Sequence, residues 1–428
     1  MPLALLSWLM RTACVLSCAI IAANLAAEER LGRTSNGTTF RGLLVGFDEQ
    51  DQPVFDTKTG SSSVPLDELL LWGELHDSPA GTQVLLSDGS LIVAEDVELD
   101  GESLLVRSQL FGEPQGFSIA GTSRLPVNIV RAIVFRVPLR PADRDRLFKR
   151  LKNVEKFEDQ LWLANGDILS GTVAQLTREQ VNGKPGPLSV TLNTTTGEVT
   201  IRPDQPQGKL LEKVQAVVFN PALVRKVDSD PPRALIGLSD GTRLFATRVE
   251  AAGEQATFTL ASGVKLKSHP DEEIWQRITS LQSIGPHVTY LSDLPPNDAS
   301  YRQTTLLGRK WPLGIDENVT GGRLRSGGNL YAKGIGMHSR ARVVFVLDRP
   351  YTKFEAELAI DESAGEQGSV TFLLARRVNG SFQIIPQSKT LVRGGEAPQT
   401  VAIDLTGASA VALFVEPADR GNVMDRAN

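Results

Sequence analysis

The chain has 428 residues, 41% of them hydrophobic and 22% charged, which is the balance of a globular protein too long for one hydrophobic core. Its 45 Lys and Arg against 50 Asp and Glu give a formal net charge of -5, so it lacks the basic footprint of a nucleic-acid-binding protein. We therefore expect several domains and no nucleic-acid partner.

The first 27 residues are typical of a secretory signal peptide. Arg11 precedes an apolar run over 12–23, and small residues follow before Glu28, so we expect cleavage after Ala27. An uncleaved anchor is the alternative, but the apolar run is short for a membrane span. Val15–Cys18 also weakly resembles a lipoprotein box, with little apolar sequence before it. We predict export to the periplasm, cell surface or medium, with no membrane span after cleavage.

Both cysteines, Cys14 and Cys18, lie inside this leader. The mature protein therefore has no disulfide, no thiolate nucleophile and no cysteine metal site. Its stability must come from its cores, which fits a bacterial periplasm or cell surface better than a small disulfide-rich secreted domain.

Four stretches of the chain begin alike, with a small polar residue, Asn or Asp, Gly, and then an alternating apolar run. Asn-Gly and Asp-Gly between such runs predict hairpins with type I′ turns, which need positive φ at both central residues. Each copy has room for about five short strands, as in Sm-like or SH3-like small barrels, which the pattern resembles. Some of those barrels bind RNA or peptides, but the acidic balance argues against RNA and favours a scaffold. The turn glycines are Gly37, Gly89, Gly166 and Gly241.

A charged stretch at 141–160 separates the second and third copies. Leu147, Leu151, Val154 and Phe157 recur at helical spacing, so we predict a solvated amphipathic helix that joins two barrels. Acidic residues dilute its cations, which argues against a membrane-surface helix. The predicted order is a signal peptide at 1–27, small barrels at 28–76 and 77–140, the helical linker at 141–160, small barrels at 161–228 and 229–285, and a C-terminal sandwich at 286–428.

The residue pattern of the chain changes after a segment rich in turn-forming residues near Pro286. Period-two runs such as 341–361, 368–380 and 400–417 predict strands with short turns and little helix. An antiparallel β-sandwich is the architecture that such runs favour. The fold class predicted for the whole chain is all-β.

The stretch from roughly Val288 to Asn428 resembles the NPCBM domain, a carbohydrate-binding module family. "YLSDLPP" opens it, and the family's Lys-Gly-Ile-Gly-Met-His run is present at Lys333–His338. A second family run, which usually ends in Gly-Ile-Asp, is present at Phe354–Asp361 with Ala359 in place of Gly.

The family's closing Asp-His-Ala-Asp-Trp run appears here as Asp425–Asn428. Arg426 replaces the His, Asn428 replaces the second Asp, and the sequence stops where the Trp would come. These departures concern the binding site rather than the fold.

The resemblance implies a galactose-binding-like β-sandwich, or jelly roll, whose relatives bind galactose-type sugars at loops on one end, sometimes with a structural calcium. We expect no other cofactor. Sugar recognition uses an aromatic face for the apolar side of a pyranose and planar polar groups for adjacent hydroxyls. The candidate residues are Trp311, His338, Asp361, Asp425, Arg426 and Asn428.

Four candidates also have a structural interpretation. Trp311 can belong to the core, and His338 can fix a loop through hydrogen bonds. Asp361 can close a turn or a calcium loop, and Asp425 can bond backbone amides. We expect no more than half of the six to touch a sugar.

No catalytic constellation is present in the sequence. It has no Gly-x-Ser-x-Gly elbow, no Gly-x-x-x-x-Gly-Lys loop, and four scattered histidines without a metal-binding pair. The acids of Glu95–Glu102 lack the cleft that a glycosidase needs. Gly334 and Gly336 precede a strand, so they do not form a phosphate loop, which requires a helix N-terminus. We predict that the chain is not an enzyme.

The interpretation that we favour is an exported, non-catalytic carbohydrate-binding protein whose barrels form a scaffold. One alternative is a cell-envelope structural or protein-interaction protein whose sandwich has lost sugar binding. Another is the non-catalytic part of a longer glycoside hydrolase.

Overall fold

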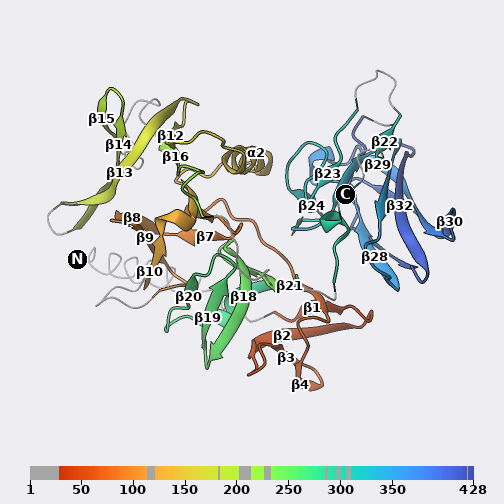
Figure 1. Ribbon diagram of the computed structural model, residues 1–428. Helices are drawn as coiled ribbons and strands as arrows, with labels where there is room; N and C mark the ends of the chain where they lie inside the picture. Colours follow the sequence, from red (N-terminus) through yellow and green to blue (C-terminus); the bar gives the residue numbers. More distant parts are fainter. Residues whose placement is uncertain are drawn as a thin grey trace, which may run out of the picture.

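The computed structural model describes residues 28–112, 121–181, 184–201, 214–225, 233–284, 288–294, 296, 300–304, 310–421 and 423–428. The predicted signal peptide lies outside these residues. Within them the protein is all-β, as predicted, with four antiparallel sheets before residue 285 and a sandwich after it (Figure 1). No helix in these ranges combines the length and the apolar character needed to cross a bilayer.

In each of the four N-terminal sheets the last strand lies beside the first, and in three of them the other strands follow in sequence. Sheet I contains β1 (Arg30–Thr34), β2 (Thr39–Phe47), β3 (Pro53–Thr57), β4 (Gly60–Ser63) and β5 (Leu69–Gly73). Sheet II contains β6 (Thr82–Leu86), β7 (Leu91–Ala94) and, after the short helix η1 (Val127–Ile129), β11 (Val130–Val134). The strands between β7 and β11, which are β8 (Asp96–Asp100), β9 (Ser103–Ser108) and β10 (Gly121–Pro126), pair with one another in a separate three-stranded sheet.

The other two sheets repeat the arrangement of sheet I. Sheet III contains β12 (Asp159–Leu163), β13 (Ile168–Val181), β14 (Lys184–Thr194), β15 (Gly197–Ile201) and β16 (Val214–Val218). Sheet IV contains β17 (Ala234–Leu238), β18 (Arg243–Ala252), β19 (Gln255–Leu260), β20 (Lys265–Lys267) and, after α3 (Ile274–Arg277), β21 (Ile278–Ser283).

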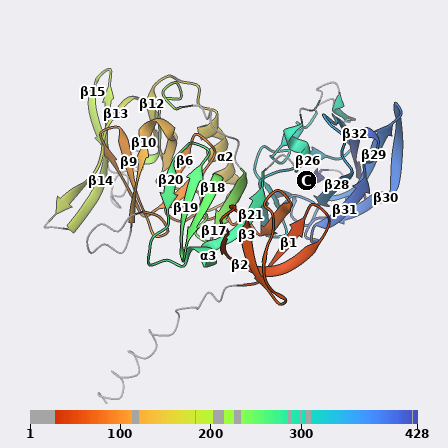
Figure 2. The ribbon, with the colours of Figure 1, turned by 60° about the horizontal axis from the view of Figure 1, so that its bottom comes forward.

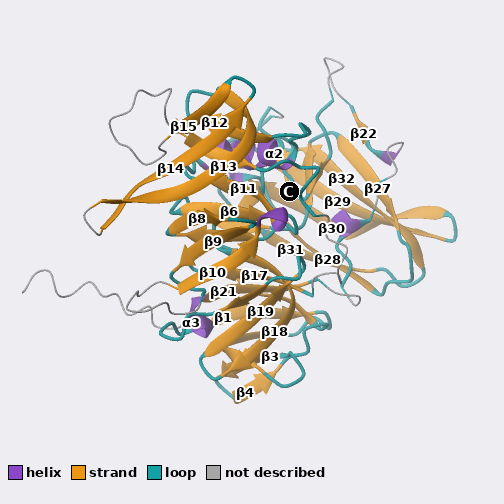
Figure 3. Ribbon diagram, turned by 60° about the vertical axis from the view of Figure 1, so that its left-hand side comes forward, coloured by secondary structure: helices purple, strands orange, loops and turns teal. Residues whose placement is uncertain are grey.

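The predicted small barrels are not confirmed, because the four sheets are open. In the described ranges, no pairing joins the last strand of a sheet to the strand that precedes it in sequence. The free edge of each last strand is instead taken by the last strand of another sheet, β5 by β21 and β11 by β16. With a contact between β7 and β18, the sheets follow one another in the order I, IV, II, III (Figure 3).

The predicted hairpin turns are present, but they are not of type I′. All four glycines have positive φ, between 90° and 96°. The preceding Asn or Asp does not, because its side-chain oxygen accepts the N–H of the residue after the glycine, as Asn36 does from Thr38 at 2.9 Å. Each turn is a three-residue loop with the glycine at its left-handed position.

Helix α2 (Pro141–Lys152) is shorter than predicted and is not solvated on all sides. It ends before Asp159, which already pairs as the first residue of β12, and Phe157 is 75% exposed. Leu147 and Leu151 are buried against β11, β12 and β16. The N-terminal half of the helix borders the sandwich, where Asp145 pairs with Arg323 (Figure 2).

The C-terminal sandwich has two layers around one core. One layer is a five-stranded sheet in the order β22 (Arg302–Gln303), β27 (Ala341–Val346), β32 (Ala408–Pro417), β29 (Ser369–Val378) and β30 (Ser381–Arg393). Facing it are β28 (Lys353–Leu358) with β31 (Gln399–Asp404), β23 (Gly314–Ile315) with β26 (Ile335–His338) and β33 (Arg426–Ala427), and the hairpin of β24 (Leu324–Ser326) with β25 (Asn329–Tyr331). Short helices η3 (Leu291–Asp293) and η5 (Glu362–Ala364) complete it. Alternate residues such as Val343, Phe345 and Val370 fill the core.

Candidate functional site

The short strand β33 brings the separate motif segments of the sandwich together. It pairs with β26, so that Arg426 lies opposite His338, and Ala427 forms a bridge with Ile360 on its other side. All six candidate residues therefore gather around β33. Trp311 reaches this place from the loop before β23 by stacking on His338.

Trp311 is held by one contact of its ring and two hydrogen bonds of its backbone. Its indole stacks on the imidazole of His338, with ring centroids 5.0 Å apart and planes only 3° from parallel. Its backbone N–H donates to Oε1 of Gln303 at 2.7 Å, and the hydroxyl of Tyr301 donates to its carbonyl oxygen at 3.1 Å. His338 is buried and Trp311 half-buried, so part of the indole faces solvent.

Asp425 fixes a loop rather than presenting itself to a ligand. Its side chain is fully buried, and Oδ1 accepts the backbone N–H of Ser369 at 3.0 Å. Burial raises the pKa of this carboxyl, and the hydrogen bond from Ser369 opposes that rise. This arrangement agrees with the structural interpretation of Asp425.

Asp361 is occupied by hydrogen bonds within the protein. It is 1% exposed and accepts the N–H of Ser363 at 3.0 Å as the N-cap of η5. The same carboxylate accepts the backbone N–H of Arg325 at 3.3 Å and the amide groups of Asn318 at 3.2 Å and Asn428 at 2.8 Å. Asp361 and Asn428 therefore brace three loops, with no carboxylate oxygen left for a ligand.

Arg426 is half-buried and keeps donor groups near the surface. Its Nη1 donates to the carbonyl and the hydroxyl of Ser363, both at 2.9 Å. Residues directly opposite in an antiparallel pair point to the same face, so Arg426 shares the face of His338 and its stacked indole. Trp311 and Arg426 are thus the two candidates placed to meet a ligand from solvent.

Residues that the sequence did not single out complete this end of the sandwich. Asn318 folds its own loop by accepting the N–H groups of Thr320 and Gly322, and its amide reaches Asp361. The Asn-Val-Thr-Gly-Gly stretch that begins at Asn318 is a turn signal that could have located it. Gln303, which bonds Trp311 and the carbonyl of Ser339, carries no local signal. No group of three or more His, Cys, Asp or Glu in the described ranges could hold a metal ion.

The fold and the site define the C-terminal third of the chain as an antiparallel β-sandwich module. Residues 287–428 match the model of the NPCBM/NEW2 domain family, and this part of the chain is such a domain, as its motifs predicted. No curated protein matches the chain in sequence.

Similar solved structures include three from two organisms. The CBM51-2 and INT domains of Clostridium perfringens ZmpB, in complex with GlcNAc, are 22% identical, cover 42% of this chain and 38% of that chain, and give a TM-score of 0.27. The CBM51 of Clostridium perfringens GH95, in complex with methyl-galactose, is 20% identical over 32% of this chain and 93% of that chain, with a TM-score of 0.26. Tandem CBM51 modules of Sp3GH98 from Streptococcus pneumoniae are 12% identical. They cover 75% of this chain and 94% of that chain and also give a TM-score of 0.26. This chain thus spans well under half of the ZmpB structure, and likeness at this level says nothing about what it binds.

Proposed function

We propose that this chain is an exported, non-catalytic carbohydrate-binding protein. Its C-terminal sandwich recognises a galactose-type glycan, and the N-terminal sheets form the scaffold that carries it. The NPCBM/NEW2 match over 287–428 supports the ligand class. The single structural observation that carries the site is the half-buried Trp311, whose indole lies flat over His338 at one end of the sandwich.

The physical argument starts from what a sugar requires. The apolar face of a pyranose packs on an aromatic ring, and planar donors or acceptors bond the hydroxyls around it. Trp311 supplies the ring, and Arg426 on the same face supplies charged donors. Because stacking on His338 already fixes the indole of Trp311, binding costs little additional side-chain entropy. His338, Asp361, Asp425 and Asn428 then act by holding this end in place.

Calorimetric titration of the chain with methyl-galactoside and galactose-containing oligosaccharides tests the proposal. Trp311→Ala should abolish methyl-galactoside binding, because it removes the ring, whereas Trp311→Phe should retain part of it. Phe382→Ala is the matched control, since Phe382 is an aromatic side chain 48% exposed on the far edge strand β30. Equal loss in Trp311→Ala and Phe382→Ala, or no binding of any sugar, would defeat the proposal.

A cell-envelope protein without sugar binding is a second candidate function. It is favoured because both oxygens of the Asp361 carboxylate accept hydrogen bonds from within the sandwich. Absence of binding on a glycan array, together with specific capture of an envelope protein, would favour it. The non-catalytic part of a larger glycoside hydrolase is a third.

A further inference from the structure

The sandwich is fixed against the N-terminal sheets by an apolar contact. Leu75, Leu235 and Leu330 are buried together, and Leu75, which follows β5, forms a β-bridge with Leu330 of β25. Beside them Arg33 of β1 pairs with Glu357 of β28 at 2.6 Å. Sheet I, sheet IV and the sandwich thus meet along one boundary.

A network of buried charges also holds this boundary. Asp77 pairs with Arg144 of α2 and with Arg325 of the sandwich, each at 2.6 Å. Arg323 pairs with Asp77 at 2.9 Å and with Asp145 of α2 at 2.5 Å. These five side chains are only 4% to 17% exposed, so the orientation of the sandwich is set by groups that have few alternative partners.

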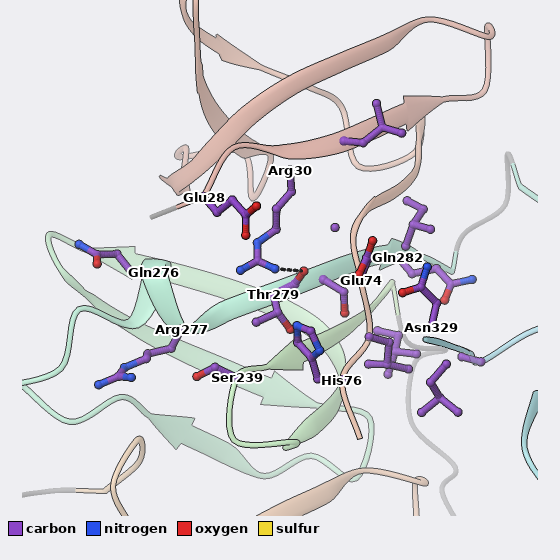
Figure 4. Close-up of a pocket in the computed structure, with 18 of the residues that line it drawn as sticks. Glu28, Arg30, Glu74, His76, Ser239, Gln276, Arg277, Thr279, Gln282 and Asn329 are labelled. Atoms are coloured by element: carbon purple, nitrogen blue, oxygen red, sulfur yellow. Dashed lines mark hydrogen bonds between the residues drawn. The ribbon is translucent and has the colours of Figure 1, made fainter. Parts of the chain in front are cut away.

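A cavity of about 990 Å³ lies at this boundary (Figure 4). Sheet I contributes residues of β1 and β5, sheet IV contributes β21 and the segment around α3, and the sandwich contributes 329–333 and Glu357. Its volume is at the upper end of the range for small-molecule sites, which is about 300–1,000 Å³. The cavity is therefore large enough for more than one sugar ring.

Three polar side chains from sheet I and the segment after it face this cavity. Arg30 donates one N–H to the carbonyl of Thr279 at 3.2 Å (Figure 4). Glu74 and His76 are two residues apart on an extended segment, so they point to the same side, while Leu75 points into the apolar contact. In the described part of the chain, neither the carboxylate of Glu74 nor the imidazole of His76 has a hydrogen-bond or ion-pair partner within 4 Å, and both interact with Arg30 only through longer-range electrostatics. These groups are available to a ligand.

The charges of the cavity exclude a polyanion. Its acidic side chains slightly outnumber its basic ones, and several basic ones are already paired, as Arg277 is with Glu272 and Lys333 is with Asp293. Burial and the nearby Arg30 lower the pKa of His76, so at neutral pH its imidazole offers one donor and one acceptor. A carboxylate, a guanidinium and a neutral imidazole suit adjacent hydroxyls, and Leu71 and Leu330 supply apolar wall for ring C–H groups.

We propose that this cavity is a second carbohydrate subsite, distinct from the end of the sandwich around Trp311. It takes a short neutral oligosaccharide, with Arg30, Glu74 and His76 as its hydrogen-bonding groups. The ligand class rests on the proposed function, whereas the location rests on the cavity alone. The N-terminal sheets then contribute to recognition as well as to support.

The test compares three forms of the full chain with the wild type, titrated with methyl-galactoside and with trisaccharides of galactose and N-acetylglucosamine. Glu74→Gln combined with His76→Ala should weaken trisaccharide binding about 10- to 100-fold, the effect of losing hydrogen bonds to a charged group, and leave methyl-galactoside binding unchanged. Glu98→Gln, an exposed acid on β8 outside the cavity, is the control. Thermal unfolding of each variant establishes that it is folded.

Trp311→Ala separates the two sites. If it removes all binding and the cavity variant has no effect, the cavity proposal is wrong and the proposed function stands. If trisaccharide binding is lost only in the cavity variant, the cavity proposal holds and the site at Trp311 is wrong. If the wild type binds none of these sugars, both are wrong. Crystals soaked with the trisaccharide supply the independent readout, with ligand beside Arg30 expected.

Discussion

Asp77→Asn should loosen the sandwich from the N-terminal sheets. Asp77 is 11% exposed and pairs with three guanidinium groups, those of Arg144, Arg323 and Arg325. After the substitution, Asp145 is the one carboxylate of this network that remains to balance three buried guanidinium groups. Breaking a buried ion pair by removing one partner costs about 3–5 kcal/mol, so we expect a loss of that order in the free energy that holds the boundary.

The control is Asp100→Asn, which removes a pair with Arg124 whose side chains are 60% and 56% exposed. Such a surface pair is worth about 0–1 kcal/mol. Hydrogen exchange followed by mass spectrometry should show faster exchange over β24 and β25 in Asp77→Asn and no change in the control. Equal exchange in the two variants would refute the claim that the buried network fixes the sandwich.

The same network predicts that the stability of the boundary between the sandwich and the N-terminal sheets depends on pH. Burial alone would raise the pKa of Asp77, but the pairs with Arg323, Arg144 and Arg325 outweigh it and hold the pKa far below its usual range. A carboxyl whose pKa is depressed in the folded state stabilises the folded protein fully at pH values above its pKa in the unfolded chain, about 3.9. That stabilisation is lost as the pH falls below this value. The boundary should therefore persist to about pH 4 and weaken in stronger acid, and this dependence should disappear in Asp77→Asn.

Two further predictions concern tyrosines and turn glycines. Burial raises the pKa of Tyr290 and Tyr301 to about 12, so a spectrophotometric titration should show two tyrosines ionising near that value. The free energy of unfolding should fall as pH rises above about 10, where the same tyrosines ionise in the unfolded chain. Ionisation of every tyrosine near pH 10 would contradict this. Gly166→Ala and Gly241→Ala both place a side chain at positive φ, but the added Cβ meets nothing at Gly166 and lies 2.6 Å from Ser78 Cβ at Gly241. Thermal unfolding should show a loss of about 1 kcal/mol for the first and a larger loss for the second, and equal losses would count against the packing argument.

The sequence predicted local features more fully than contacts between distant segments. The positions of the four turns followed from Asn-Gly and Asp-Gly, but their type did not, because it depends on a hydrogen bond from the Asn or Asp side chain. Small closed or half-closed barrels were expected from the number of strands in each copy. Nothing in the sequence of β5 or β11 indicates that its free edge pairs with β21 or β16.

In the candidate site, too, the sequence predicted local features better than contacts between distant segments. The family motifs identified residues that gather at one end of the sandwich, although they could not separate the half-buried Trp311 from the fully buried Asp361. The charges of α2 were interpreted as a solvated face, since the partners of Arg144 and Asp145 lie far away in the sequence, at Asp77 and Arg323. The cavity beside Arg30 has no sequence signal, because three separate parts of the chain form it.

Titration of the chain with methyl-galactoside and galactose-containing oligosaccharides, before and after Trp311→Ala, tests the central claim most directly. The account predicts saturable binding that Trp311→Ala abolishes at the sandwich and that Phe382→Ala leaves intact. Absence of binding to every sugar by the folded wild-type chain, or binding unaffected by Trp311→Ala, would contradict a carbohydrate site at this end of the sandwich.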